Sequence, residues 1–369
     1  MVSIHQKYAQ LLVNYCLSVQ PNQKVYIVST YLAEPLIKEV YKEILRIGAF
    51  PEIKIILPEE NKIFIDLAQE HQLDYVSPIN QLIYESFDAY LYIRAPYNLR
   101  EDQNIDRSKS ARKSKANTIL NTTFSERTAT GSLKRCICQY PTFAGAQEAG
   151  LSLEEYEHFI YNSCKLFDDN PTQSWQSLGE NQQKIVDYLN KADSVRYQNE
   201  KTDISFSVKD RIWINSDGKA NMPSGEVFTA PIEDSVNGII FFDYPSIFAG
   251  KEVKDMTLKV KDGWIEEWSA ALGQDLLDEI FKIEGARRFG EVAIGTNYDI
   301  QFATKNILFD EKIGGTIHMA IGQSYLQNGG KNQSTIHWDM IADMKNGGKI
   351  VVDDQLIYEN GYFLGDLFI

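Results

Sequence analysis

The feature that most constrains the fold is a change in the spacing of apolar segments near residue 190. Before it, short runs rich in β-branched and aromatic residues alternate with segments of helical periodicity. After it, short alternating segments follow one another, separated by turn residues such as Asp262-Gly263, a strong hairpin signal. The expected strands of the first part are Lys24–Ser29, Pro51–Leu57, Phe87–Arg94 and Lys134–Gln139.

This order of segments predicts an α/β fold in two parts. Strands that alternate with helices imply right-handed crossovers and a largely parallel sheet, so the N-terminal part is expected to be a doubly wound-like α/β domain. The C-terminal part is expected to be a mixed, antiparallel-rich α+β domain. A chain of 369 residues is long enough for two hydrophobic cores. A break at Asp168-Asp-Asn-Pro-Thr-Gln and a helix expected over 175–191 place the boundary at residue 185, giving domains 1–185 and 186–369.

Composition excludes several classes of function. The formal net charge of −14 leaves nothing to neutralise phosphates, so no nucleic-acid partner is expected. The basic cluster Arg107–Lys115 has the spacing of a solvated helix face within a helix expected over 107–127. No apolar run is long enough to cross a bilayer, and the first residues lack the pattern of a secretory signal. Four cysteines do not form a disulfide framework in a chain of this size, so the cytoplasm is the expected location.

The first half offers no nucleotide site. The turn after its first strand reads Ser29-Thr-Tyr-Leu-Ala, without a glycine-rich fingerprint or a phosphate loop. A dinucleotide cofactor is therefore not expected. We interpret residues 1–185 as a scaffold, a lid or a dimerisation surface.

Two of the five histidines lie in short apolar runs near glycines, between residues 314 and 340. The strand period of two places His337 and Asp339 on the same face of one run. One imidazole and one carboxylate suit a divalent ion of borderline softness. His318, on the neighbouring run, is positioned to supply a second imidazole. Taken singly, each of these residues is better read as a satisfied core residue, but three of them in one region, flanked by glycines, favour a metal site.

Two glutamates extend this set of candidate ligands. Glu226 lies in a turn framed by proline and glycine, and Glu291 opens a buried-looking strand. A lone charge in such a place is costly to bury unless it is paired or metal-bound, although an exposed carboxylate at a strand end fits the pattern equally well. Two glutamates, two histidines and one aspartate exceed the four ligands of a tetrahedral zinc site. The inventory suits two cations bridged by carboxylate.

Four segments of the second half, 221–231, 287–294, 317–325 and 336–343, resemble the thermophilic-type metalloaminopeptidases, the family of aminopeptidase T, aminopeptidase S and peptidase S. The motifs are Asn-Met-Pro-Ser-Gly-Glu-Val-Phe-Thr-Ala-Pro, Gly-Glu-Val-Ala, Ile-His-Met-Ala-Ile-Gly, Gly-Gln-Ser-Tyr and Ile-His-Trp-Asp-Met. In that family two glutamates, two histidines, a tyrosine and an aspartate hold two metal ions. The resemblance therefore implies six metal ligands here, namely Glu226, Glu291, His318, Tyr325, His337 and Asp339. Tyr325 enters through the resemblance alone, because no spacing singles it out.

The resemblance implies a dinuclear metal-dependent aminopeptidase that removes the N-terminal residue of peptides through a metal-bridging water or hydroxide. Residues 186–369 would be its catalytic metal-binding domain, with zinc, cobalt, manganese or magnesium as the two divalent ions. Its substrates would be peptides with a free N-terminus, and the chain would be a homodimer. The connection from Tyr325 to His337 is shorter than is usual in the family, which leaves the substrate preference open.

The remaining alternatives concern the proton shuttle and the class of protein. Glu233 and Asp234 follow Glu226 closely and are candidates for the group that carries a proton to the leaving amine, although such turn charges are usually only solvated. One competing class is a two-domain binding protein with a structural metal or none. Another is a different metal-dependent amidohydrolase, or a phosphatase, because fold and metal alone do not select the substrate. Six candidate ligands favour an open site over a closed four-ligand one.

Overall fold

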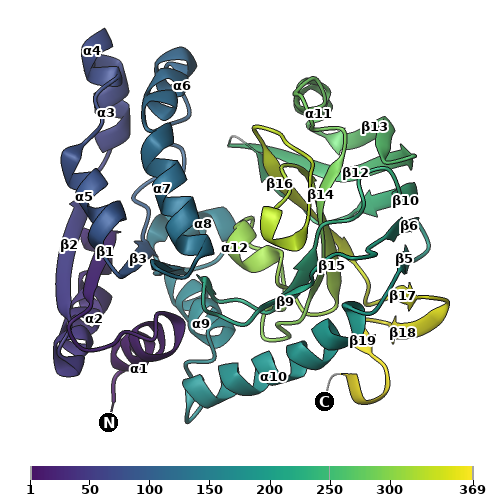
Figure 1. Ribbon diagram of the computed structural model, residues 1–369, viewed down its shortest axis with the longest axis horizontal. Helices are drawn as coiled ribbons and strands as arrows, with labels where there is room; N and C mark the ends of the chain where they lie inside the picture. The colour runs from purple at the N-terminus through teal and green to yellow at the C-terminus, as the bar shows by residue number, and fades with distance from the viewer. Residues whose placement is uncertain (1, 249, 368–369) are drawn as a thin grey trace. The chain divides into compact units, whose positions relative to one another are not determined.

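The computed structural model describes residues 2–248 and 250–367, and the chain divides into two compact units (Figure 1). The first unit comprises the residues up to Thr172 together with 218–223. The second comprises 173–217 and the residues from Ser224 onward. The compact units change over at residue 172, near the start of helix α10 (Pro171–Leu189). The domain boundary expected at residue 185 stays a prediction.

A parallel sheet with the strand order β2-β1-β3-β4-β8 forms the centre of the first unit. The outermost strand, β8, has only two residues and arrives from far along the sequence, so no periodicity could have revealed it. The other four strands coincide with the expected ones within two residues. The strands are β1 (Lys24–Thr30), β2 (Phe50–Ile56), β3 (Ala89–Arg94), β4 (Lys134–Gln139) and β8 (Asn221–Met222).

Helices connect these strands, and several of them begin or end at capping residues. Gly48 closes α2 in the left-handed conformation, at a φ of 81°. Ser152 and Glu155 form a capping box at the start of α9. The helices are α1 (Ile4–Gln10), η1 (Leu11–Cys16), η2 (Tyr31–Ala33), α2 (Glu34–Ile47), α3 (Glu60–Leu67), α4 (Glu70–Leu73), α5 (Pro78–Ser86), α6 (Arg107–Ala116), α7 (Thr118–Ala129), α8 (Phe143–Ala149) and α9 (Leu153–Ser163).

The single helix expected over 107–127 is wrong, because the chain forms α6 and α7 with a break at Asn117. The Asn117 side chain donates a hydrogen bond to the carbonyl of Lys113 at 2.9 Å and so competes with the helical ladder. Helix α6 has no buried residue, which agrees with its basic cluster being a solvated face.

Two sheets form the second unit. The larger is antiparallel and runs β11-β12-β10-β6-β5-β17-β18-β19, with β13 paired to β12. Its β12–β13 hairpin turns at Asp262-Gly263, where both residues have positive φ (49° and 77°), as the sequence predicts. Its strands are β5 (Ser194–Gln198), β6 (Asp203–Ser207), β10 (Asn237–Phe242), β11 (Ser246–Phe248), β12 (Lys251–Lys261), β13 (Trp264–Leu272), β17 (Lys349–Val352), β18 (Gln355–Glu359) and β19 (Tyr362–Phe363).

The smaller sheet is also antiparallel, in the order β16-β15-β14-β9-β7. Side chains along each of its strands point alternately to two faces, which differ in chemistry. One face packs into the hydrophobic core of the unit through residues such as Val292, Ile317, Met319 and Met340. The strands are β7 (Ile214–Ser216), β9 (Glu226–Thr229), β14 (Phe289–Gly295), β15 (Thr316–Gly322) and β16 (His337–Asp343), and the helices of the unit are α10, α11 (Gln274–Ile280), α12 (Ile307–Asp310), η3 (Leu326–Asn328) and η4 (Gly365–Leu367).

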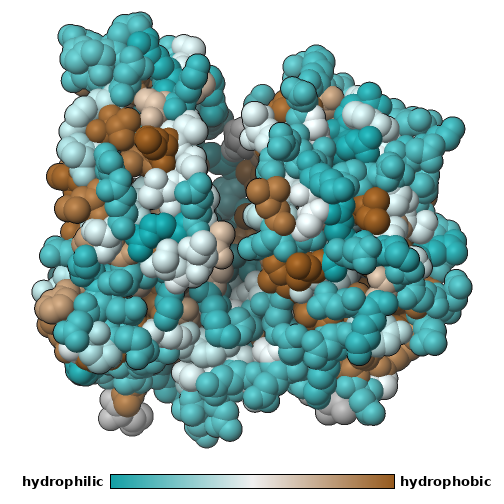
Figure 2. Space-filling view, in the orientation of Figure 1, coloured by the Kyte–Doolittle hydropathy of each residue, from teal (hydrophilic) through white to brown (hydrophobic). Residues whose placement is uncertain are grey.

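Hydrophilic residues cover most of the face shown in Figure 2, and apolar side chains gather there in small patches. Among the helices of the described chain, none combines the length and the apolarity needed to traverse a bilayer.

Candidate metal centre

The strand register of the smaller sheet brings five of the predicted ligands to one face. Ala320 of β15 pairs with Glu291 on one side and with Asp339 on the other. Paired residues of an antiparallel ladder point to the same face, and so do residues two apart along a strand. His318 and His337, each two residues from a member of this row, therefore share the face of Glu291 and Asp339. Glu226 joins them, since it pairs with Gly295, four residues after Glu291.

Local backbone features direct the two glutamates to this face. Gly225, at a φ of 112°, brings the chain so close to Asn297 that a Cβ there would lie 2.7 Å from the Asn297 Cβ. Only glycine fits this position, and β9 begins directly after it with Glu226. A β-bulge interrupts the β14–β15 ladder between Phe289 and Glu291, a device that commonly re-aims a side chain beside a functional site.

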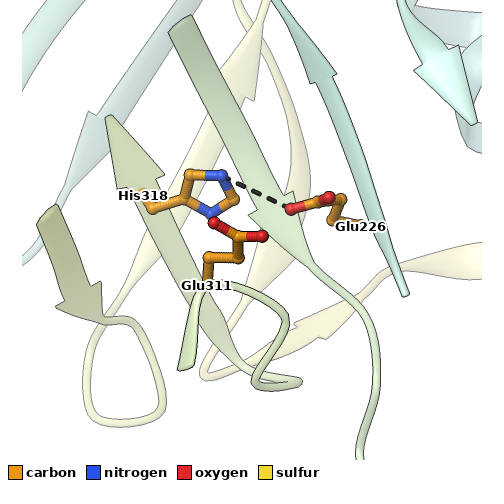
Figure 3. Close-up of side chains that lie close together, drawn as sticks. All are labelled: Glu226, Glu311 and His318. Carbon is orange, nitrogen blue, oxygen red and sulfur yellow. Dashed lines mark ion pairs between the residues drawn. The ribbon is translucent and has the colours of Figure 1, made fainter. Parts of the chain in front are cut away.

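Two groups of side chains result, each with one imidazole and two carboxylates. In the first, donor atoms of Glu226, Glu311 and His318 lie within 4.8 Å of one another. His318 Nε2 is 3.5 Å from Glu226 Oε2, the pair joined by the dashed line in Figure 3. Figure 3 also shows the Glu311 carboxylate next to the same imidazole.

The second group consists of Glu291, His337 and Asp339, whose donor atoms also lie within 4.8 Å of one another. His337 Nε2 is 3.5 Å from Glu291 Oε2 and 3.5 Å from Asp339 Oδ1. The other oxygen of Glu291, Oε1, accepts a hydrogen bond from His318 Nε2 at 3.2 Å. Glu291 thus faces both histidines, one with each oxygen, and links the two groups.

The residues present fit divalent cations. His337 Nδ1–H donates to the carbonyl of Gln323 at 2.8 Å, which directs Nε2 toward the carboxylates. Three buried polar atoms, Glu226 Oε2, His318 Nδ1 and Asp339 Oδ1, have no hydrogen-bond partner within the described part of the chain. Buried polar atoms without partners are costly, and a bound cation would satisfy them. Oxygen and nitrogen donors without sulfur suit zinc, cobalt, manganese or magnesium.

The electrostatics of the ion-free cluster show how closely its charges are coupled. Burial alone would lower the pKa of both histidines, but the surrounding carboxylates raise it to about 9 for His318 and about 10 for His337. Burial acts on Asp339 in the opposite sense, yet His337 lowers the pKa of that carboxyl to about 2. Burial also raises the pKa of Glu291. Without a bound ion, both rings are therefore protonated on both nitrogens (imidazolium) at neutral pH. A cation that binds one ring nitrogen must displace the proton from that nitrogen.

Tyr325, the sixth predicted ligand, lies beside the second group. Its ring is 5.1 Å from the His337 ring and 6.0 Å from that of Phe228. Burial and the nearby carboxylates, Glu291 first among them, raise the pKa of its phenol. A cation beside it would favour the phenolate instead. Its role as a ligand stays a prediction.

The two candidates for the proton shuttle lie outside both donor groups. Glu233 Oε2 forms an ion pair with Arg211 at 2.7 Å, and Glu233 Oε1 accepts a hydrogen bond from the backbone N–H of Lys331 at 2.7 Å. Asp234 is exposed. Their catalytic role stays a prediction, and the contacts of Glu233 account for it as a structural residue.

Sequence reasoning missed two charged residues at the site, Glu311 and Lys312. Glu311 follows helix α12 as its C-cap residue, and Lys312 is completely buried. Lys312 Nζ lies 3.4 Å from Glu226 Oε1 and also bonds to Glu311. Burial and the charge of Glu226 raise the pKa of Glu311 to about 8, against the lowering effect of Lys312. An adjacent charge pair just before Gly314-Gly315 was the one available signal, and it reads as an ordinary turn.

Fold and site together define a candidate metalloenzyme with two linked carboxylate–imidazole groups on one sheet face. Comparison with known proteins narrows this class: the sequence profile of the thermophilic metalloproteases (M29) matches residues 3–363. The chain therefore belongs to this family, and the resemblance read from its motifs is confirmed. Membership makes it a metallopeptidase, which is a hydrolase with a divalent metal cofactor.

Relatives and a solved structure agree with this assignment. Aminopeptidase AmpS from Bacillus subtilis (strain 168) is 34% identical over 206 residues, an alignment that spans half of either protein. Aminopeptidase 2 from Geobacillus stearothermophilus is 27% identical over 391 aligned positions, with 93% of both chains covered. The structure of wild-type AmpT from Thermus thermophilus superposes with a TM-score of 0.83 at 22% identity, covering 98% of this chain and 99% of that one. This likeness concerns the fold and confirms the expected α/β class with its parallel and antiparallel sheets.

Proposed function

We propose that the chain is a dinuclear metal-dependent aminopeptidase that removes the N-terminal residue of peptides. The observation that carries this proposal is the position of Glu291, whose two oxygens face His318 and His337 at 3.2 and 3.5 Å. A carboxylate so placed is suited to bridging two cations, one in each group. The names of the relatives, all aminopeptidases, support the exopeptidase assignment.

The division of ligands follows from the two groups. Glu226 and His318 would hold one ion, His337 and Asp339 the other, with Glu291 between them and Tyr325 completing the set that the family resemblance implies. Such ions lower the pKa of a bound water and polarise the scissile carbonyl. The Gln323 carbonyl keeps the His337 ring oriented, so that its Nε2 stays available.

The charged partners of the cluster bear on which end of the peptide it would bind. Four carboxylates, those of Glu226, Glu291, Glu311 and Asp339, lie with a single lysine at the site. With two divalent ions bound, these groups would bring the site close to neutrality. Lys312, the lysine at the site, is fully buried and already paired with Glu226 and Glu311, so it is not available to a substrate carboxylate. An amino terminus, as a neutral donor, is accommodated instead. This favours an aminopeptidase over a carboxypeptidase.

A capped-peptide assay tests the proposal. The metal-reconstituted protein is expected to release leucine from leucyl-peptides, to lose this activity when the amine is acetylated, and to keep it when the peptide is lengthened at its C-terminal side. Acetylation removes the lone pair of the amine and adds bulk where the substrate must end. Equal cleavage of capped and free peptides would indicate an endopeptidase, and cleavage of neither would favour a binding protein with a structural metal. The homodimer and the cytoplasmic location inferred from the sequence stay predictions.

A further inference from the structure

Strand β2 is the outermost strand of the parallel sheet, and within the described residues no strand pairs with its outer side. Strands of such sheets are normally buried on both faces, as Val25 and Ile27 of β1 are. In β2, by contrast, the side chains of Phe50, Ile53 and Ile55 are 56%, 41% and 39% exposed. Apolar surface is visible in Figure 2 along the margin of the first unit where Figure 1 places β2. An exposed apolar edge strand is a template for pairing with another strand.

The backbone of β2 also presents hydrogen-bonding groups on this outer side. Phe50 N–H donates to the carbonyl of Gln23 at 2.8 Å, so the backbone groups of Phe50 face β1. These directions alternate along a strand, and the N–H and C=O groups of Ile53 and Ile55 therefore point away from β1. Pro51 points the same way and has no N–H group, so it offers only its carbonyl. The outer side thus carries a short row of donors and acceptors centred on Ile53.

The sequence of β2 is complementary to itself when a second copy runs antiparallel to it about Ile53. This residue is the middle one of the seven residues of the strand. A two-fold axis at Ile53 places Glu52 opposite Lys54 of the second copy, and Lys54 opposite Glu52 of the second copy. The remaining cross-strand pairs are apolar on both sides, namely Phe50 with Ile56 and Pro51 with Ile55. Opposite charges and apolar side chains that face each other across two strands stabilise their pairing.

Two residues of β2 are of the kind that usually protects an edge strand, and neither opposes this register. Proline and lysine at an edge hinder pairing with unrelated strands. Pro51 nevertheless has a carbonyl to accept a hydrogen bond from the Ile55 N–H of the second copy. Lys54 is paired with Glu60 of its own chain at 2.9 Å, but its side chain is 45% exposed and so has room for a second carboxylate. These residues therefore favour a second copy of β2 over other extended segments.

We propose that β2 is an interface at which two copies of this chain pair about a two-fold axis at Ile53. The two parallel sheets then join into one continuous sheet, in which β2 runs antiparallel to β2 of the second copy. Ile53 exchanges backbone hydrogen bonds with Ile53 of the second copy, and on either side an Ile55 N–H meets a Pro51 carbonyl. The homodimer expected from the sequence has no assigned surface, and this inference does not depend on the aminopeptidase function.

Charge reversal tests the proposed register. In Glu52→Lys each copy presents a lysine opposite Lys54, and in Lys54→Glu each copy presents a glutamate opposite Glu52, so either variant alone should associate more weakly. An equimolar mixture of the two variants places opposite charges at both contacts and should restore association. The control is Glu279→Lys, the same change of charge at an exposed glutamate of α11 in the second unit. Analytical ultracentrifugation of the full chain over a concentration series measures the mass, to be compared with the chain mass of 42.1 kDa.

The wild type and Glu279→Lys are expected to reach twice the chain mass. The Kd for association should rise about tenfold or more in Glu52→Lys and in Lys54→Glu, because two cross-strand pairs change from attraction to repulsion. In the mixture the Kd should return close to the wild-type value. A wild type that keeps the mass of one chain at every concentration would overturn the proposal. So would a dimer that neither variant weakens, or a mixture that associates as weakly as its components.

Cysteine cross-linking tests the position of the axis. The four native cysteines are buried, so they should contribute little background. The double variant Glu52→Cys/Lys54→Cys places each new cysteine directly opposite one of the second copy, at the spacing of a non-hydrogen-bonded pair, which suits a disulfide. This variant should form a covalent dimer with oxidised glutathione. Glu52→Cys alone, which is offset by two residues from its counterpart, should not, and equal cross-linking of the single and double variants would contradict an axis at Ile53.

Discussion

His337 shows how one side chain is prepared for its part by its surroundings. The Gln323 carbonyl can only accept a hydrogen bond, so His337 Nδ1 must carry the proton and Nε2 faces Glu291 and Asp339. The spacing in the sequence was enough to pair His337 with Asp339. They lie two residues apart on strand β16, and side chains two apart on a strand point to the same face.

Removing either member of this pair should abolish turnover without unfolding the protein. His337→Ala and Asp339→Ala are each expected to lower kcat more than about 100-fold. Mutation of a residue that only orients a metal ligand already lowers metal affinity or activity by about 10- to 100-fold, and loss of a ligand should cost more. The matched control is His71→Ala, an exposed histidine of the first unit. Circular dichroism checks the fold, and wild-type turnover in either variant at saturating metal would show that the ligand assignment is wrong.

The raised pKa values of the histidines predict how metal affinity depends on pH. The ion-free protein holds a proton on His318 and on His337 up to pH values of about 9 and about 10. A cation binds only the deprotonated nitrogen, so protons compete with it at neutral pH. Between about pH 6 and about pH 8 the apparent affinity of each ion should rise about tenfold per pH unit, one proton being released per imidazole. Competition titrations against a chelator measure this slope, and a pH-independent affinity would exclude both histidines as ligands.

At the scale of elements, the site depends on small residues between the charged ones. Ala320 is fully buried and lies across the ladder from both Glu291 and Asp339. Its methyl group leaves the space that the two carboxylates share.

Ala320→Leu should therefore fill this space, prevent metal binding and abolish activity. Met319→Leu is the control, since Met319 is the neighbouring residue on the core face and a swap of similar volume costs less than about 1.5 kcal/mol. Metal content and thermal unfolding are measured together. An Ala320→Leu variant that still binds metal as the wild type does would contradict the shared-face geometry.

Elements with strong periodicity were predictable, and those without it were not. Strands β1, β3, β4, β15 and β16 follow from apolar runs of ordinary length, and the one-face placement of His337 and Asp339 follows from β16 alone. The two-residue strand β8 and the four-residue helix α12 are too short to produce a pattern. Glu311 and Lys312 were missed together with α12. The tertiary fold brings them next to Glu226 and His318, and their spacing in the sequence gives no sign of this. The position of Glu291 between the two histidines depends on the register between β14 and β15, which no single strand reveals.

At the scale of the whole molecule, the two units contribute differently to the proposed reaction. Both donor groups, Glu311 and Lys312 all belong to the second unit, whose apolar sheet face forms a continuous core beneath them. Four carboxylates lie together where the proposed cations would be bound. Such a concentration of like charge is stable only if cations or protons compensate it.

The most direct test of the account is the number and position of ions in the active protein. Elemental analysis of the reconstituted enzyme, combined with anomalous diffraction from its crystals, should show two ions per chain. One should lie at Glu226 and His318 and the other at His337 and Asp339, with Glu291 bound to both. A fully active protein that holds a single ion per chain, or ions placed elsewhere, would contradict the dinuclear site.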